Sequence, residues 1–402
     1  MVTTATSAHP AGPHADVKQR IADAVEAHRD EILGLSRRIH ANPEPAFEEY
    51  QAAEWVAEAV GGHGFAVERP VGSLATAVRG RLTGGLGPNG PRIGVLAEYD
   101  ALPGLGHGCG HNTMAASGVG AAIALAMIRD AFAGEVVFLG TPAEERGSGK
   151  RIMIEDGLFR DLDAALLYHP CTRNHVEIYP QASEDVYVTF HGLQAHAASD
   201  PWAGKNALDA LVLLFSSVGL WRQQLRPEAR VHGIVQEGGT AANIIPDRAK
   251  AWFMVRSVDQ AYFEQMRDRF KALAEAAALA TDTTLEIEFT GGATTMNNNT
   301  TLAERWVANA AAYGVVDEGP YEAFGSTDMG NVSWVCPTIH PDLAIADKGT
   351  PGHSIAFREA AATPQADTVT LLAATLVAQT ALDLFADQKL VEAAWEEFRK
   401  AT

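Results

Sequence analysis

The chain has 402 residues, 47% of them hydrophobic and 20% charged, and a formal net charge of -19. The length favours two domains, and the composition is that of an ordinary globular protein rather than a disordered one. The negative charge argues against nucleic acid or an anionic membrane as a partner, since binding either requires a Lys/Arg surface.

The N-terminus, up to about Pro13, has the composition of a loose tail and lacks the charged and apolar blocks of a signal peptide. No apolar run reaches the roughly 18 residues that a membrane span needs. Three dispersed cysteines are too few for a disulfide scaffold and indicate a reducing compartment. We therefore expect a cytoplasmic protein without a membrane partner.

The first part of the chain has apolar residues at helical spacing. This spacing predicts one helix from Asp16 to Ile39 and another from Glu48 to Val60. Strand patterns follow at Leu74–Leu82 and Arg92–Glu98, with a Gly/Pro-rich turn between them. An Ala/Gly-rich helix, a strand, a short helix at Lys150–Asp156 and another strand come next. This alternation predicts an α/β domain with a mainly parallel sheet and helices on both faces.

From about Ser183 the pattern changes to strand, long helix, two strands, long helix and strand. Such a βαββαβ unit could fold as a ferredoxin-like α+β domain. Helical patterns resume at Thr301, so the unit interrupts the larger domain. We expect a discontinuous catalytic domain at 14–183 and 297–402, and a second domain at 184–296.

Side chains that can hold a metal follow three of the strand-like runs. RIGVLAEYD ends at Asp100, EVVFLGTPAEE ends at Glu144 and Glu145, and DAALLYHP reaches His169. In an open α/β sheet the active crevice forms outside the carboxyl ends of the strands, so these side chains would converge there. Taken singly, the Glu-Glu pair could be a solvated acidic turn and His169 a structural histidine.

The glycine-rich segment GHGCGHN adds His107, Cys109 and His111 at the start of a helix. A thiolate and an imidazole on a loop with little side-chain bulk suit zinc and similar divalent ions. An isolated CGH would more simply be a turn with a buried thiol. His353 is flanked by loop-type residues and would not be identified by spacing alone. The segment GSTDMGN also has a loop-like composition, with a possible helix N-cap at Ser326 or Thr327.

In order along the chain, the segments EYDALPGLGHGCGHN, TPAEERGSGK, YHP, GLQAHAA, GGTAANIIPDRA, GSTDMGN and GTPGHS resemble a known family. It is the dinuclear-metal peptidase family of aminoacylases, folate-type carboxypeptidases and indole-acetyl-amino-acid hydrolases. The resemblance covers about Ile32 to Leu384 and is strongest to the branch of the aminobenzoyl-glutamate hydrolase B subunit and related dipeptidases.

The resemblance implies an amidohydrolase with two divalent ions per chain, zinc or manganese. A metal-bridging hydroxide would cleave the amide of an N-acyl amino acid or dipeptide-like substrate. Glu144 would act as the general base. The metal ligands implied position by position are Cys109, His111, Glu145, His169 and His353.

The interrupting domain would be a lid that also forms a homodimer. His196 would reach into the partner's site to steady the oxyanion, although it could simply be an exposed lid histidine. Asn243 and Arg256 are candidates for binding substrate, with a strand-end charge as the alternative for Arg256.

The chain departs from the family at one point. Many relatives have His-x-Asp where this chain has Glu98-Tyr99-Asp100, which agrees with the branch that uses a cysteine ligand. Asp100 would then orient a ligand rather than bind metal. Asn112 after CGH favours the dipeptidase branch. Two rival hypotheses stay open: a thiol hydrolase with Cys109 as nucleophile, and a non-catalytic or partner-dependent component of a hydrolase complex.

Overall fold

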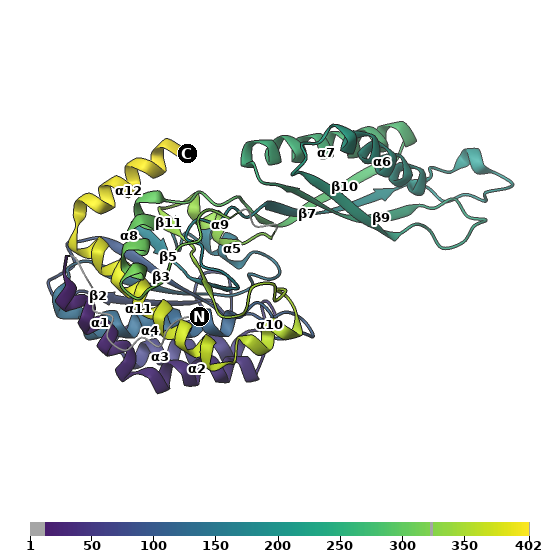
Figure 1. Ribbon diagram of the computed structural model, residues 1–402. Coiled ribbons are helices and arrows are strands. Elements are labelled where there is room, and N and C mark those ends of the chain that lie inside the picture. The colour runs from purple at the N-terminus through teal and green to yellow at the C-terminus, as the bar shows by residue number, and fades with distance from the viewer. Residues whose placement is uncertain (1–12, 322–324, 402) are drawn as a thin grey trace. The chain divides into compact units, whose positions relative to one another are not determined.

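The computed structural model describes residues 13–321 and 325–401, which form two compact units (Figure 1). The larger unit contains the described residues up to Tyr179, residues 296–321, and the chain from Asp328 onwards. The smaller unit is Pro180–Thr295 together with residues 325–327. The expected N-terminal tail lies outside the described residues except for Pro13.

The larger unit is built on a six-stranded sheet with the order β1-β2-β4-β3-β5-β11. The last four of these strands are parallel, and β2 and β1 extend the sheet antiparallel at the β4 edge. A short parallel pair, β6 with β12, follows. The prediction of a mainly parallel sheet is therefore confirmed. The strand bounds are β1 (Ala66–Glu68), β2 (Val78–Thr83), β3 (Arg92–Glu98), β4 (Glu135–Thr141), β5 (Ala164–Leu166), β6 (His169–Cys171), β11 (Thr338–Ile339) and β12 (Asp342–Ala344).

The helices of the larger unit include one break that the periodicity did not predict. The helix expected at 16–39 is two helices, separated at His28. No apolar residue larger than alanine lies between Val25 and Ile32, and Asp30 and Glu31 favour a new helix N-terminus. The bounds are α1 (Ala15–Ala27), α2 (Arg29–Ala41), α3 (Tyr50–Gly62), α4 (His111–Met127), α5 (Gly149–Glu155), α8 (Thr300–Ala311), α9 (Met329–Ser333), α10 (Ile355–Ala360), α11 (Pro364–Ala386) and α12 (Gln388–Ala401).

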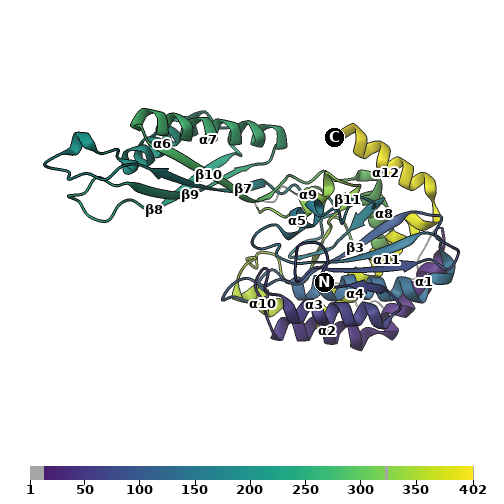
Figure 2. The same cartoon turned by 180° about the vertical axis from the view of Figure 1, so that it is seen from behind.

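Helix α4 is the centre of the helical layer on one side of the sheet, and it begins in the Cys/His loop. It packs on β3 and β4 and is covered by α1, α2, α3 and α11 (Figures 1 and 2). Its small residues allow this close packing. A Cβ on Gly118 would lie only 2.4 Å from the carbonyl oxygen of Leu96 in β3. The position of α4, and of the residues at its N-terminus, therefore depends on the absence of a side chain here.

Helix α11 corrects the sequence analysis on one point. Its 23 residues are long and apolar enough, by length and composition, to cross a membrane. In the structure, however, 89% of the most apolar window is buried inside the protein. The helix packs on α4, α8 and α1, so its apolar surface is used in the core of the larger unit.

The smaller unit has its own apolar core and the topology β7-α6-β8-β9-α7-β10. Its four strands are antiparallel in the order β10-β7-β9-β8, and both helices lie on one face of this sheet (Figure 1). This is the predicted ferredoxin-like arrangement. Asn206 and Asp259 cap the two helices through their side chains. The bounds are β7 (Ala182–His191), α6 (Ala207–Trp221), β8 (Arg230–Glu237), β9 (Arg248–Ser257), α7 (Gln260–Thr281) and β10 (Thr284–Ala293).

The loop after β4 is tied to the start of α3 by one buried carboxylate, Glu49. Its Oε1 accepts hydrogen bonds from the backbone N–H groups of Phe47 and Ala143, and its Oε2 accepts one from the Thr76 hydroxyl. Burial, with the nearby charge of Asp100, raises the pKa of Glu49 to about 7 in the metal-free protein. Glu49 thus fixes Ala143, the residue that precedes the Glu-Glu pair.

The close approach of α4 and β3 predicts a stability effect. Replacing Gly118 with Ala should lower the free energy of unfolding by about 1–3 kcal/mol, because the helix must move away from the Leu96 carbonyl. Urea unfolding followed by circular dichroism measures the change. Gly34→Ala in α2 is the control, since nothing lies within 4 Å of its Cβ position; it should stabilise by about 0.5–1 kcal/mol. Equal effects of the two substitutions would contradict the packing argument.

Glu49 predicts a pH dependence of stability. The folded state keeps the Glu49 proton up to a pH of about 7, whereas the unfolded chain loses it at about 4.5. The folded state therefore binds more protons in this window, and stability falls as the pH rises through it. In wild type this proton release should lower the free energy of unfolding by on the order of 3 kcal/mol between these pH values. Glu49→Gln should abolish that decrease. The measurement is the difference in unfolding free energy between wild type and variant, with metal removed.

Glu54→Gln, an exposed change in α3, serves as the control and should leave the wild-type pH profile unchanged. A wild-type-minus-Glu49→Gln difference that stays constant across the window would show that Glu49 does not titrate there.

Candidate metal centre

The candidate metal-binding side chains gather beyond the carboxyl ends of the parallel strands, in loops, at the first residue of α4 and in the short strand β6. Strand β3 ends at Glu98, two residues before Asp100, and β4 ends at Thr141, three residues before Glu144. The expectation that the strands themselves end on these groups is corrected in this detail. The loops carry the site, while β3 and β4 pair in register from Arg92–Glu135 to Glu98–Thr141 and fix where the loops begin.

Five potential ligands form two groups that share Cys109. One ligand atom from each of Cys109, His111 and His169 lies within 4.8 Å of the others. The same holds for Cys109, Glu145 and His353. A third group consists of Glu98, His111 and Glu144. The structure thus brings together, around one thiol, residues from four separate segments of the larger unit.

Cys109 and His169 face each other, with 3.6 Å between Sγ and Nε2. Burial, followed by the neighbouring His340, lowers the pKa of His169 to about 3, which leaves the imidazole neutral with a lone pair to offer. Burial and the charge of Glu145 raise the pKa of the Cys109 thiol well above its usual range. Without an added cation this cysteine is therefore held as a thiol.

His111 is the first residue of α4 and is oriented by Asp100. Its Nδ1 lies 2.9 Å from the Asp100 carbonyl oxygen and 3.1 Å from Asp100 Oδ1. Because those oxygens can only accept, Nδ1 carries the proton when they are its partners, and Nε2 is left to face the acidic groups. Asp100 Oδ2 also accepts the backbone N–H of Glu145 at 2.8 Å. Asp100 thus holds two potential ligands in place, and it belongs to none of the three groups.

A buried ionic network lies behind the site. Lys150, with no exposed side-chain surface, contacts Glu98 Oε1 and donates to Asp328 Oδ1 at 2.6 Å. The backbone N–H of Lys150 donates to Asp328 Oδ2. These contacts hold Glu98 with its second oxygen, Oε2, 3.4 Å from His111 Nε2. The network thus fixes one carboxylate of the site beside His111.

Three buried polar atoms at the site lack hydrogen-bond partners: Glu98 Oε2, His111 Nε2 and Glu145 Oε1. Such atoms are costly to bury unless something else binds them. They belong to the same groups as a thiol and a neutral imidazole, which is the mixed sulfur, nitrogen and oxygen donor set that zinc-type ions accept. The residues present therefore fit a pair of divalent ions.

The Glu-Glu pair stands on a strained turn. Ala143 and Ser148, on either side of it, have φ values of 61° and 53°, a region that non-glycine residues rarely occupy. A Cβ on Gly149 would lie 1.9 Å from the Pro142 carbonyl oxygen, so the turn closes tightly on itself. Burial, with the charges of Glu98 and Glu145, raises the pKa of Glu144 well above its usual range. A carboxylate of raised pKa suits a group that takes up and returns a proton.

His353 comes from a loop late in the chain and is attached to the Cys109 loop through the backbone. Its N–H donates to the Gly108 carbonyl oxygen at 3.1 Å, and its φ is 52°. Its Nε2 lies 3.5 Å from Glu145 Oε2, and its side chain is 57% exposed. His353 is thus the ligand candidate on the open side of the site.

Two residues of the Cys/His segment face elsewhere. His107 is buried, with Nε2 3.1 Å from the Ile39 carbonyl oxygen, and it belongs to no metal-type group among the described residues. Asn112 donates to Ser36 and to the Ala361 carbonyl, which joins α4 to α2 and to the end of α10. Both residues support the loop from behind.

Local sequence patterns do not predict the supporting network of Glu98, Lys150 and Asp328. Lys150 and Asp328 both lie in the motifs TPAEERGSGK and GSTDMGN, but nothing in the spacing of these motifs indicates that the two side chains meet. Ser326 and Thr327 are the expected N-cap residues of the helix in GSTDMGN. In the structure Asp328 is the N-cap of α9.

His196, Asn243 and Arg256 belong to the smaller unit. His196 forms an isolated bridge with Ile244, and Ala197 donates to the Asn243 carbonyl, so His196 and Asn243 are neighbours. The Nδ1 of His196 accepts the backbone N–H groups of Ala198 and Ser199, which leaves Nε2 to carry the proton. Arg256 lies at the end of β9, apart from this pair, with Nε 3.0 Å from Met254 Sδ; burial lowers its pKa.

Comparison with known proteins gives consistent results. The family described as peptidase family M20/M25/M40 matches residues 94–374. The Xaa-Arg dipeptidase of Homo sapiens is 37% identical over 95% of this chain and 92% of its own length. The B subunit of the p-aminobenzoyl-glutamate hydrolase of Escherichia coli is 30% identical over 96% of each chain.

Solved structures agree in fold. A putative aminohydrolase from Staphylococcus aureus matches 92% of this chain with a TM-score of 0.75 at 21% identity. A dinuclear metal-binding peptidase of Bacillus subtilis from family M20 matches 90% of this chain and 99% of its own, with a TM-score of 0.67 at 22% identity. The family match over most of the chain, together with relatives of 30% identity or more over nearly its whole length, shows that this protein is a hydrolase of peptidase family M20/M25/M40.

Proposed function

We propose that the protein hydrolyses the amide bond of a dipeptide or N-acyl amino acid at a two-metal centre. The observation that carries the proposal is the pair of donor groups that share Cys109. Cys109, His111 and His169 would hold one ion, and Cys109, Glu145 and His353 the other. Zinc or manganese would suit these donors. When bound, the ions supply Lewis-acid chemistry, polarising the amide carbonyl and acidifying a water molecule.

Glu144 is the proposed general base. It stands beside Glu145 and within 4.8 Å of the nearest ligand atoms of His111 and Glu98, and it carries a raised pKa. It takes a proton from the attacking water and returns it to the nitrogen of the leaving amine as the amide bond breaks. Asp100 positions His111 and the Glu145 loop throughout, through the hydrogen bonds to Nδ1 and to the Glu145 N–H.

The rival with Cys109 as nucleophile has little support. A nucleophilic cysteine needs a lowered pKa from a neighbouring cation or helix N-terminus. Burial and Glu145 instead raise the pKa of Cys109. That rival also gives no role to His353 or to the Glu-Glu pair, whereas the two-metal proposal uses all of them.

For the substrate, we propose a dipeptide with a cationic C-terminal residue as the first class to assay. The human and mouse relatives named Xaa-Arg dipeptidase are 36–37% identical over 95% of this chain. The formal net charge of -19 would also favour the approach of a cationic substrate over an anionic one. A p-aminobenzoyl-glutamate substrate, suggested by the Escherichia coli relative's name, is the anionic comparison.

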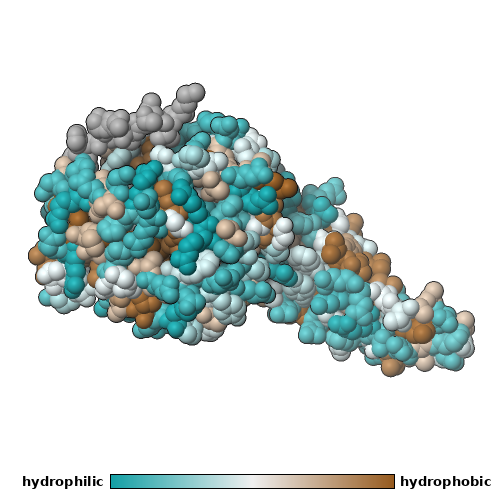
Figure 3. Space-filling view, turned by 90° about the horizontal axis from the view of Figure 1, so that it is seen from below, coloured by the Kyte–Doolittle hydropathy of each residue, from teal (hydrophilic) through white to brown (hydrophobic). Residues whose placement is uncertain are grey.

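We further propose that the protein is a homodimer formed through the smaller unit. Strand β8 is an edge strand, and Ile234 and Val235 on it are 57% and 53% exposed. Apolar side chains also gather on the face of this unit seen in Figure 3. An exposed apolar edge strand is a template for pairing with a second copy about a two-fold axis.

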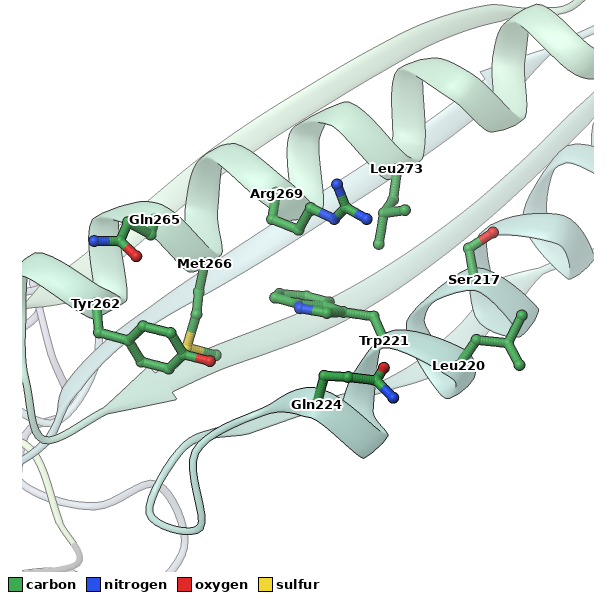
Figure 4. Close-up of a pocket in the computed structure, with 9 residues that line it drawn as sticks. All are labelled: Ser217, Leu220, Trp221, Gln224, Tyr262, Gln265, Met266, Arg269 and Leu273. Atoms are coloured by element: carbon green, nitrogen blue, oxygen red, sulfur yellow. The ribbon is translucent and has the colours of Figure 1, made fainter.

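The helical face of the same unit offers additional apolar surface. Leu220 of α6 is 75% exposed and borders a groove between α6 and α7 of about 580 Å³, together with Trp221 and Met266 (Figure 4). None of the proposed metal ligands lines this groove. It therefore fits association better than catalysis.

In such a dimer His196 would serve the partner's metal centre by donating a hydrogen bond from Nε2 to the developing oxyanion. Asn243, its neighbour, would contact the same substrate, and Arg256 would bind a substrate carboxylate.

We propose a reducing, cytoplasmic setting for the protein, because the thiol of Cys109 must stay unoxidised to bind metal.

The two-metal proposal predicts about two ions per chain by elemental analysis and a loss of amide hydrolysis on chelation that zinc or manganese restores. Glu144→Gln should lower kcat by roughly 10²–10⁴-fold while leaving the metal content unchanged, since it removes only the proton acceptor. Glu155→Gln, on the exposed side of α5, is the matched control. Full metal occupancy with no hydrolysis of any dipeptide or N-acyl amino acid would instead support the hypothesis of a non-catalytic component.

The dimer proposal predicts complementation between two inactive variants. His196→Ala and Glu144→Gln chains, each inactive alone, should regain about one quarter of wild-type activity after mixing and exchange. Half of the dimers are then mixed, and each mixed dimer has one complete site if His196 acts on the partner. Light scattering gives the oligomeric state. Mixed dimers without recovered activity would place His196 in its own chain's site, and a His196→Ala chain that is active alone would place His196 outside catalysis.

A further inference from the structure

A second cluster of metal-type side chains lies on the larger unit, outside the centre described above. One ring nitrogen each from His28 and His63, and one carboxylate oxygen of Glu31, lie within 4.8 Å of one another. The residues come from three helix ends: the junction of α1 and α2, the first turn of α2, and the C-terminus of α3. No residue of the proposed catalytic machinery belongs to this cluster.

The hydrogen bond of His28 suits metal binding. His28 Nδ1 lies 2.9 Å from the Ala24 carbonyl oxygen. A carbonyl oxygen can only accept, so Nδ1 carries the proton and Nε2 keeps the lone pair that a metal requires. This is the backbone support that metal-binding histidines usually have, because it fixes the tautomer and the ring orientation.

The Glu31 carboxylate is already adjacent to His63. His63 Nε2 lies 3.0 Å and 3.2 Å from the two carboxylate oxygens of Glu31. The His28 and His63 rings meet edge to face, with centroids 5.1 Å apart and planes at 81°. His63 is mostly buried, whereas Glu31 is 44% exposed and can adjust. Metal binding would displace the proton that His63 Nε2 shares with the Glu31 carboxylate, and the exposed Glu31 side chain can turn to share the ion.

We propose that His28, Glu31 and His63 bind one zinc-type divalent cation, with water completing its coordination. Two imidazoles and one carboxylate favour zinc, cobalt, nickel or copper over magnesium and calcium, which prefer all-oxygen sites. The bound ion would connect the C-terminus of α3 to the α1–α2 junction. Because α2 and α3 both pack on α4, it would stabilise the helical layer behind the catalytic loop.

The experiment is equilibrium dialysis against buffered free zinc, followed by elemental analysis per chain. Wild type should bind one zinc ion more than His63→Gln or His28→Gln at saturation. Glu31→Gln, a change at an exposed side chain, should shift that extra binding to higher free zinc without altering the fold. Thermal unfolding with zinc should show a larger rise in Tm for wild type than for the histidine variants.

His191→Gln is the matched control. His191 forms a histidine–glutamate pair with Glu286, 3.3 Å apart, but this pair belongs to no metal-type group among the described residues. The control should bind as much zinc as wild type. Equal zinc content in wild type, His28→Gln and His63→Gln at saturating free zinc would overturn the proposal and leave an ordinary ion pair. Failure of the catalytic two-metal proposal would instead lower the zinc content of all these proteins alike, so the two failures are distinguishable.

Discussion

The whole site depends on the concentration of negative charge at one edge of the sheet. Glu98, Asp100, Glu144, Glu145 and Asp328 converge there, and Lys150 is the one lysine or arginine that forms an ion pair with any of them among the described residues. Buried like charges raise one another's pKa, as Glu98 and Glu145 do for Glu144. Two divalent ions would supply the missing positive charge, so metal binding and the stability of this edge are coupled. The protein satisfies part of this need with Lys150 and leaves Glu98 Oε2, His111 Nε2 and Glu145 Oε1 without hydrogen-bond partners.

Several features of the fold hold these acidic side chains in position. The β3–β4 register fixes the starting points of two loops. The absence of a side chain at Gly118 lets α4 approach β3, and His111 is the first residue of α4. Hydrogen bonds then connect the loops: Asp100 joins His111 to Glu145, and Glu49 holds Ala143. Ala143, next to the Glu-Glu pair, and His353 have strained positive φ values at the points where the chain presents potential ligands.

The sequence predicts the fold class and the location of the site well, for a local reason. Apolar strands followed by acidic residues or histidine, and a glycine-rich loop with Cys and His before a helix, are visible within short windows. The break at His28 was missed because α1 and α2 together keep an approximately helical period, and only the polar gap before Ile32 marks the boundary.

Contacts over long sequence distances could not be predicted in the same way. Glu98 and Lys150 are 52 positions apart, and Lys150 and Asp328 are 178 apart, so their pairing depends on how the whole larger unit closes. The roles proposed for His196, Asn243 and Arg256 require contacts beyond the smaller unit, which neither a local sequence pattern nor the structure of that unit alone supplies. Family resemblance, rather than periodicity, was therefore the only source of those three assignments.

The discontinuous layout has a consequence for how the chain folds during synthesis. The smaller unit has its strands and helices within Pro180–Thr295, so it can fold as soon as that stretch leaves the ribosome. The larger unit cannot close then, because α11, which packs on α4, and His353 are made only near the end. For that interval α4, apolar along nearly its whole length, lacks the part of its cover that α11 supplies. The nascent N-terminal half is thus the part of this protein that most needs a chaperone.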